Sequence, residues 1–221
     1  LTLPDVTAAG MLPLAMRFAR LQVDHGGTPS LVVGGPFTVA GNICGVDRLC
    51  RWVIRKPQLV DHVLRLATDH LVEVAQHWVD TFGAGRVYMQ IWEPLTSNQI
   101  ISPRHFENVV LPYQVELHRK VLEMGIGQLL CHICGEQNQN LPAWAQVPMG
   151  AGGIVSIGRE VDISTAIEHF GEDRIIAGNI DPALLQTGTP GEIYESCRKA
   201  IEMGKRAPRG FALMQGCEVP I

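Results

Sequence analysis

The sequence lacks the features that would place the chain in a membrane, on nucleic acid or in a disulfide-stapled fold. None of its apolar runs reaches the roughly 20 residues that span a bilayer, and its first residues do not resemble a signal peptide. Its formal net charge is −4 and its 18 Lys and Arg residues are scattered, whereas a nucleic-acid surface needs a basic stripe. Six cysteines in 221 residues are too sparse for a disulfide framework and are typical of reduced thiols or metal ligands. We therefore expect a cytoplasmic protein that binds neither nucleic acid nor membrane.

Segments of strand length alternate with helical patterns along the whole chain. No low-complexity segment or charged linker interrupts them, so residues 1–221 are expected to form a single domain. The strands are rich in Val, Ile, Leu and Ala, as strands covered on both faces are, and their alternation with helices predicts parallel pairing. The expected strands are residues 31–33, 86–91, 128–133, 153–157, 174–180 and 210–214, and the expected helices are residues 57–78, 106–124, 163–170 and 190–203.

Two α/β architectures fit this alternation: an open doubly wound sheet and a (β/α)8 TIM barrel. A doubly wound sheet would favour a glycine-rich dinucleotide loop after its first strand. The turn at Gly34, Gly35 and Pro36 does not match that fingerprint, because proline has no N–H to offer a phosphate. The barrel is therefore favoured, although about six strands can be counted where a barrel needs eight.

The sharpest local motif is the run Cys131, His132, Ile133, Cys134 and Gly135. A redox pair of Cys131 and Cys134 would need both thiols at the start of a helix, but this motif closes an apolar strand and leads into a polar loop. Side chains alternate along a strand, so His132 and Cys134 share one face while Cys131 points to the other. The pattern therefore favours His132 and Cys134 as partners in a metal site over a redox pair.

A third metal ligand must come from elsewhere in the chain, because catalytic zinc sites usually have three protein ligands and one open position. Cys217 follows Gly216 just after the last expected strand, and in a barrel this is the rim where the strand of His132 also ends. Cys197 falls inside a helix, and Cys44 and Cys50 fall in or after the loop that follows the first strand. Spacing alone leaves two readings open, a metal site and ordinary packed core residues.

Five stretches in the same order resemble the uroporphyrinogen decarboxylase-like superfamily. Its zinc-dependent methylcobamide:thiol methyltransferases carry an H-x-C…C motif, to which His132, Cys134 and Cys217 are similar. The other stretches are Gly35-Pro36-Phe37-Thr38, Ile101-Ser102-Pro103 with Phe106, Leu111-Pro112-Tyr113, and Gly178-Asn179-Ile180-Asp181-Pro182.

This resemblance implies a (β/α)8 barrel that is truncated at both ends, with an early strand and the last helix missing. It implies a Zn²⁺ ion on His132, Cys134 and Cys217, a methyl-corrinoid co-substrate delivered by a corrinoid protein, and a small thiol or related methyl acceptor. Glu93 is expected on the same rim, as a further ligand or to orient a substrate. Asn179 and Asp181 are candidates for binding substrate or supporting His132, although Asp181 before Pro182 is as well explained as a helix cap.

Two other functions remain open at this stage. A cofactor-free uroporphyrinogen decarboxylase would belong to the same superfamily, but its late G-H-G turn reads Gln215-Gly216-Cys217 here, which favours the methyltransferase. A barrel that binds a corrinoid or a partner without catalysis is the third possibility.

Overall fold

Six parallel strands form one sheet whose spatial order follows the sequence. The computed structural model describes residues 2–219, and in this part of the chain the strands lie in the order β1-β2-β3-β4-β5-β6. A doubly wound sheet reverses its strand order at a switch point, whereas the wall of a (β/α)8 barrel keeps the order of the sequence. The observed order therefore agrees with the predicted barrel class, with β1 and β6 at the two edges. The strands are β1 (Ser30–Gly34), β2 (Tyr88–Trp92), β3 (Gln128–Ile133), β4 (Ile154–Ile157), β5 (Ile175–Ile180) and β6 (Phe211–Gln215).

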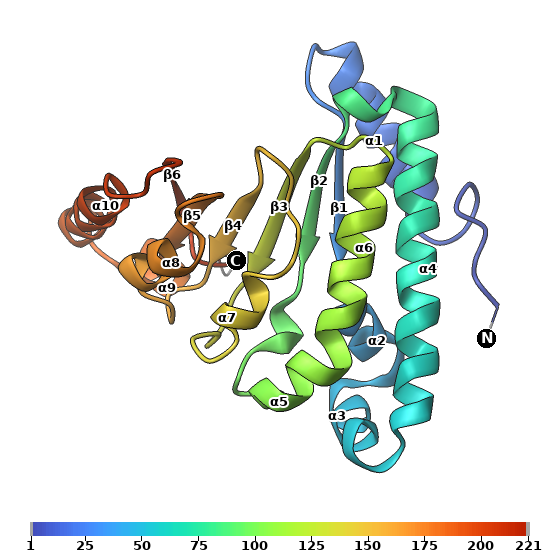
Figure 1. The fold of residues 1–221 in the computed structure, drawn as a ribbon. Helices are drawn as coiled ribbons and strands as arrows, with labels where there is room; N and C mark the ends of the chain where they lie inside the picture. The colour runs from blue at the N-terminus through green and yellow to red at the C-terminus, as the bar shows by residue number, and fades with distance from the viewer. Residues whose placement is uncertain (1, 220–221) are drawn as a thin grey trace.

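Helices cover the outer face of this sheet (Figure 1). Two long helices, α4 and α6, pack on each other beside β1 to β3, and α8 and α10 pack against β5 and β6. The apolar sides of these helices pack on the strand residues that face them, and together they make up the core. The polar groups described below lie on the other face of the sheet. The helices are α1 (Leu12–Asp24), α2 (Pro36–Cys44), α3 (Val46–Arg55), α4 (Pro57–Phe82), α5 (Pro103–His105), α6 (Leu111–Glu123), α7 (Leu141–Trp144), α8 (Ile163–Phe170), α9 (Pro182–Thr187) and α10 (Pro190–Gly204).

The four predicted helices are present, and the structure adds helices where the sequence indicated a turn or loop. Residues 36–55 form α2 and α3, so Cys44 and Cys50 lie in helices and not in a loop. Pro36 stands in the first turn of α2, where its missing N–H costs nothing. The predicted helix at 106–124 begins with a π-helical turn, Phe106–Val110, before α6. No helix in the described part of the chain is both long and apolar enough to cross a bilayer.

Strand register fixes which side chains meet on the face away from the helices. Trp92 of β2 lies opposite His132 of β3, and His132 lies opposite Ser156 of β4. Paired residues of parallel neighbours point to the same side of a sheet, so these three side chains form a row. The row lies near the carboxyl ends of the strands, where barrel enzymes carry their active sites.

Candidate metal centre

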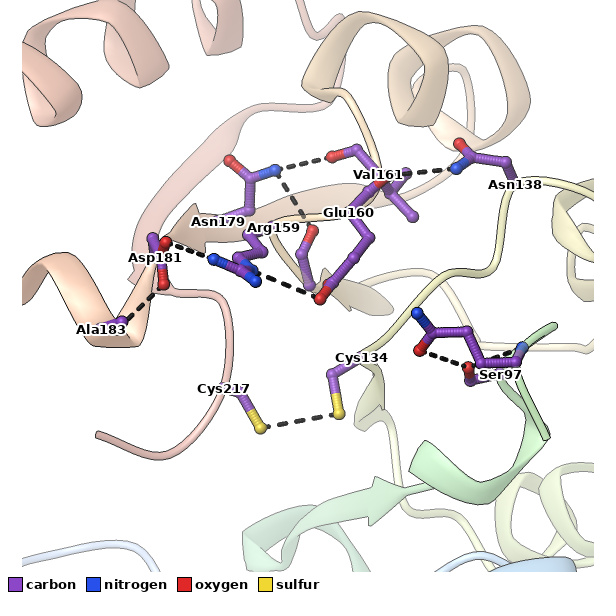
Figure 2. Close-up of polar contacts among 12 residues, drawn as sticks. Ser97, Cys134, Asn138, Arg159, Glu160, Val161, Asn179, Asp181, Ala183 and Cys217 are labelled. Atoms are coloured by element: carbon purple, nitrogen blue, oxygen red, sulfur yellow. Dashed lines mark hydrogen bonds and ion pairs between the residues drawn. The ribbon is translucent and has the colours of Figure 1, made fainter. Parts of the chain in front are cut away.

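The structure brings together His132, Cys134 and Cys217, which the sequence separates by up to 85 positions. One ligand atom from each residue lies within 4.8 Å of the corresponding atoms of the other two. The Sγ atoms of Cys134 and Cys217 are 3.6 Å apart and point toward each other (Figure 2). Cys131 faces the opposite way and is buried in the core among apolar side chains. The strand alternation inferred from the motif is therefore observed.

His132 is held in one orientation by two neighbours. Its Nδ1 atom is 2.9 Å from the Ser156 hydroxyl, and its ring lies 5.2 Å from the Trp92 ring between centroids. Its Nε2 atom is buried and has no hydrogen-bond partner within residues 2–219. Burial lowers the pKa of His132 to about 4, so the ring is neutral at pH 7 and Nε2 is free to bind a metal.

The environment of the Cys134 thiol disfavours its thiolate unless a cation is present. Burial, with a smaller contribution from the nearby Cys217, raises the pKa of Cys134 to about 12. A bound cation reverses this preference, because it stabilises both thiolates together. The geometry fits such an ion: two bonds of about 2.3 Å at a tetrahedral angle place two sulfurs about 3.8 Å apart, close to the observed 3.6 Å. A disulfide would need about 2 Å.

Glu93 follows the carboxyl end of β2 but is not part of this group, contrary to the expectation that it is a further ligand. It is fully buried, and its carboxylate accepts hydrogen bonds from the backbone N–H groups of Phe37 (3.1 Å) and Thr38 (2.7 Å). The Thr38 hydroxyl and the Gln114 amide also donate to it. Glu93 follows Trp92 and so points to the opposite face of β2, toward α2 and α6. Its carboxylate oxygens accept hydrogen bonds from groups of α2 and α6, so Glu93 connects the end of β2 to the start of α2.

Asn179 and Asp181 lie beside the group without joining it (Figure 2). One oxygen of Asp181 accepts from the N–H of Ala183 at 2.9 Å, which is the helix cap foreseen for it, and the other pairs with Arg159 at 2.6 Å. The Asn179 amide donates to the carbonyl of Val161 at 2.6 Å and to that of Gly158 at 3.3 Å. Both residues therefore brace the loop after β4.

That loop is in close contact with the segments that carry Cys134 and Cys217. A Cβ atom on Gly158 would lie 3.1 Å from the Cα of Cys134, and one on Gly216 would lie 2.9 Å from the backbone nitrogen of Arg159. Only glycine allows the three strand ends to approach so closely. The braced loop thus fixes the separation of the segments that carry Cys134 and Cys217.

Comparison with known proteins assigns the chain to a family. The sequence model of the family described as uroporphyrinogen decarboxylase (URO-D) matches residues 4–221. The chain belongs to the uroporphyrinogen decarboxylase family. A solved methyltransferase from Methanosarcina mazei superimposes with a TM-score of 0.81 at 22% identity, covering 99% of this chain and 62% of that one. The comparison shows that the two share a fold.

The relatives of this uroporphyrinogen decarboxylase family member include enzymes of two kinds. The methylcobamide:CoM methyltransferase MtbA of Methanosarcina acetivorans is 32% identical over 171 residues, covering 77% of this chain and 48% of MtbA. The uroporphyrinogen decarboxylase of Crocosphaera subtropica is 26% identical over 209 residues, covering 89% of this chain and 56% of the relative. The chain spans about half the length of the curated relatives it matches.

Two residues of this family member's site were not singled out from the sequence, Trp92 and Ser156. Their contact with His132 depends on the register of three parallel strands, which the sequence pattern does not give. A signal was present at Ser156, because a serine interrupts the otherwise apolar run Ile154–Ile157. The fully buried position of Ser156 confirms that this hydroxyl needs a partner inside the protein.

Proposed function

We propose that this chain catalyses zinc-dependent transfer of a methyl group between a corrinoid and a thiol, with His132, Cys134 and Cys217 as the zinc ligands. The observation that carries the proposal is the convergence of three ligand atoms within 4.8 Å of one another, next to an unpaired and buried imidazole nitrogen. The substrate classes are supported by relatives that are named methylcobamide:CoM methyltransferases.

Each residue has a defined task in this proposal. Ser156 holds Nδ1 of His132, so that Nε2 faces the ion, and Cys134 and Cys217 release their protons when the ion binds. Two thiolates and a neutral imidazole balance the charge of Zn²⁺ and leave one coordination position for substrate. The ion supplies Lewis acidity that lowers the pKa of a thiol in that position.

The methyl transfer then balances without a further reagent. The substrate thiol gives its proton to solvent and its sulfur forms a bond to the methyl carbon. The cobalt–carbon bond breaks as this bond forms, and its electron pair stays on cobalt. The chain's own contribution is to bind and orient the thiol beside the strand ends, where the corrinoid can approach.

Metal analysis of matched cysteine variants tests the ligand set. We expect about one zinc per chain in the parent protein and loss of zinc in Cys134→Ala and in Cys217→Ala. Cys131→Ala is the control, because its sulfur lies in the same motif but on the opposite face of β3. Zinc retained equally by all three variants would rule out the ligand set. X-ray absorption at the zinc edge should report two sulfur ligands in the parent.

Activity distinguishes methyl transfer from the other two functions of this fold. With free methylcobalamin and a simple thiol as substrates, the parent and Cys131→Ala should form the methyl thioether, and the two ligand variants should not. Porphyrinogen decarboxylation that survives in Cys134→Ala and Cys217→Ala would instead identify a decarboxylase. Corrinoid binding without any methyl transfer by the zinc-loaded parent would identify a non-catalytic barrel.

A further inference from the structure

A cationic surface on α3 and α5 lies on the same rim as the candidate metal centre. The sequence shows no basic stripe, yet folding gathers five of the chain's 18 Lys and Arg residues on these two helices and the residue after α3. All five side chains are exposed, and no salt bridge among the described residues involves any of them. The residues of this cationic surface are Arg48, Arg51, Arg55, Lys56 and Arg104.

The surface is set by the amphipathic pattern of α3. Leu49 and Val53, four positions apart, are buried against the body of the protein. Arg48, Arg51 and Arg55 are spaced by three and four positions, so they occupy one face of the helix and project into solvent. The segments 46–56 and 103–110 contain two carboxylates, Asp47 and Glu107, and therefore carry a net charge of +3 in a chain whose net charge is −4.

A chain of contacts connects this surface to the sulfur ligands. The Cys50 thiol of α3 lies 3.8 Å from the carbonyl oxygen of Ile100, in the loop after β2. In the same loop, the N–H of Asn98 donates to the carbonyl of Glu136 at 2.6 Å, two residues beyond Cys134. Figure 1 shows that α3 and α5 both lie at the end of the sheet toward which the strand arrows point. The loop after β2 therefore contacts both α3 and the segment that follows Cys134.

We propose that this cationic surface is the docking site for the acidic surface of a protein that carries the corrinoid. The inference rests on the proposed function, because a carried corrinoid must bring its methyl group to the ends of β3 and β6 and its carrier must therefore cover this rim. Unpaired arginines attract an acidic partner and speed its association. Ile54, which is 71% exposed beside the arginines, adds an apolar contact of the kind found in protein interfaces.

Charge reversal away from the metal centre provides the test. The double variant Arg48→Glu/Arg55→Glu is compared with Arg206→Glu/Arg209→Glu, which changes the charge equally on exposed arginines at the opposite end of the sheet, before β6. We expect the Kd of a purified methylated corrinoid protein, measured by calorimetry, to rise about tenfold or more in the first variant only, and the effect to shrink at high salt. Zinc content and thermal midpoint should match the parent in both variants.

The methyl donor separates failure of docking from failure of the function. With free methylcobalamin, which has no protein surface, both double variants should match the parent in activity. With the corrinoid protein as methyl donor, only the first double variant should lose activity.

An unchanged Kd in Arg48→Glu/Arg55→Glu, or an equal loss of affinity in both double variants, overturns the docking proposal. Tighter binding of a DNA duplex than of the corrinoid protein, dependent on the same arginines, would assign the surface to nucleic acid and also overturn it. Absence of methyl transfer from methylcobalamin by the parent would instead overturn the proposed function, and the calorimetric comparison would still decide the docking.

Discussion

His118 and His132 are both buried, and each has one ring nitrogen without a hydrogen-bond partner in the described part of the chain. They differ in the side chains that surround this nitrogen. His118 of α6 is fully buried, its Nδ1 lies 2.9 Å from the carbonyl oxygen of Pro148, and its Nε2 has no partner among the described residues. His132 is in a similar state, but Cys134 and Cys217 stand beside it. His118 therefore stabilises the packing of the outer layer as a neutral ring, whereas His132 has the companions that a metal ion needs.

The burial of His118 predicts a loss of stability in acid. Its pKa falls to about 4 in the folded protein, chiefly because burial disfavours the charged ring, while it stays near 6.5 in the unfolded chain. The contribution of the neutral ring is full above pH 6.5 and is lost as the pH falls toward 4, because the unfolded chain takes up the proton first. The loss at about pH 5 is roughly 2 kcal/mol. Urea unfolding at about pH 7 and pH 5 measures it.

The variant His118→Gln isolates this effect from other titrating groups. Glutamine does not titrate, so the difference between its free energies of unfolding at the two pH values should be smaller than that of the parent by about the same 2 kcal/mol. The exposed His25 provides the control, since His25→Gln makes the same replacement outside the core. Equal pH dependence in the parent and His118→Gln would contradict the assignment.

Strand alternation predicted the direction of His132 and Cys134 correctly but could not do so for Glu93. In β3 the chemistry of the side chains marks one face, because a histidine and a cysteine alternate with apolar residues. In β2 the polar Gln90 shares one face with Tyr88 and Trp92, but the predicted strand ended before Trp92, and Glu93 was expected at the rim from the resemblance and not from alternation. The hydrogen bonds from the start of α2 to Glu93 could not be predicted, because α2 itself was not predicted from the sequence.

At the scale of elements, the contact between α10 and β6 positions Cys217. Gly204 ends α10, and a Cβ atom at this residue would come within 2.2 Å of the Phe211 ring of β6. The strand lies close to the helix because this side chain is missing. Cys217 follows two residues after β6, so the packing of the strand also sets the position of the sulfur.

Two glycine-to-alanine substitutions in α10 should therefore have opposite effects. Gly204→Ala should lower the free energy of unfolding by about 1–3 kcal/mol, because the methyl group pushes Phe211 and β6 outward, and it should weaken zinc binding. Gly191→Ala, in the first turn of the same helix, has open space around its Cβ position and should be neutral or stabilising by up to about 1 kcal/mol. Denaturant unfolding and zinc titration of both variants measure the two effects. Equal stability of the two variants would contradict the packing argument.

Helices with clear periodicity were predictable, whereas α2, whose first residues also fit a turn, was not. Helix α4 has an apolar face over many turns, and its start at Pro57 was predicted correctly. Helix α2 begins with Gly35 and Pro36, which read equally well as a turn, and its buried residues are packed against α4 and not spaced along a single amphipathic face. The helical conformation of residues 36–44 depends on these tertiary contacts, so the local sequence pattern alone could not predict it.

At the scale of the whole molecule, the candidate metal centre connects distant parts of the sheet. Cys134 follows β3 and Cys217 follows β6, so the two sulfurs are 83 residues apart in the chain and three strands apart in the sheet. The alternation of strands and helices predicted the fold class and placed both cysteines after strands, but it could not show that these two strand ends lie close together in space. That required the strand order, which the sequence pattern leaves open.

Because the proposed ion joins the ends of β3 and β6, its removal should destabilise the whole sheet. A ligand that binds only the folded state at about 100 times its Kd stabilises that state by about 2.7 kcal/mol. We expect the zinc-loaded parent to have a higher free energy of unfolding than the chelator-treated parent by about this amount, and zinc to restore it. The double variant Cys134→Ala/Cys217→Ala should show no difference between the two conditions. Identical unfolding curves for the parent with and without zinc would mean that no ion ties these strands together in the folded protein.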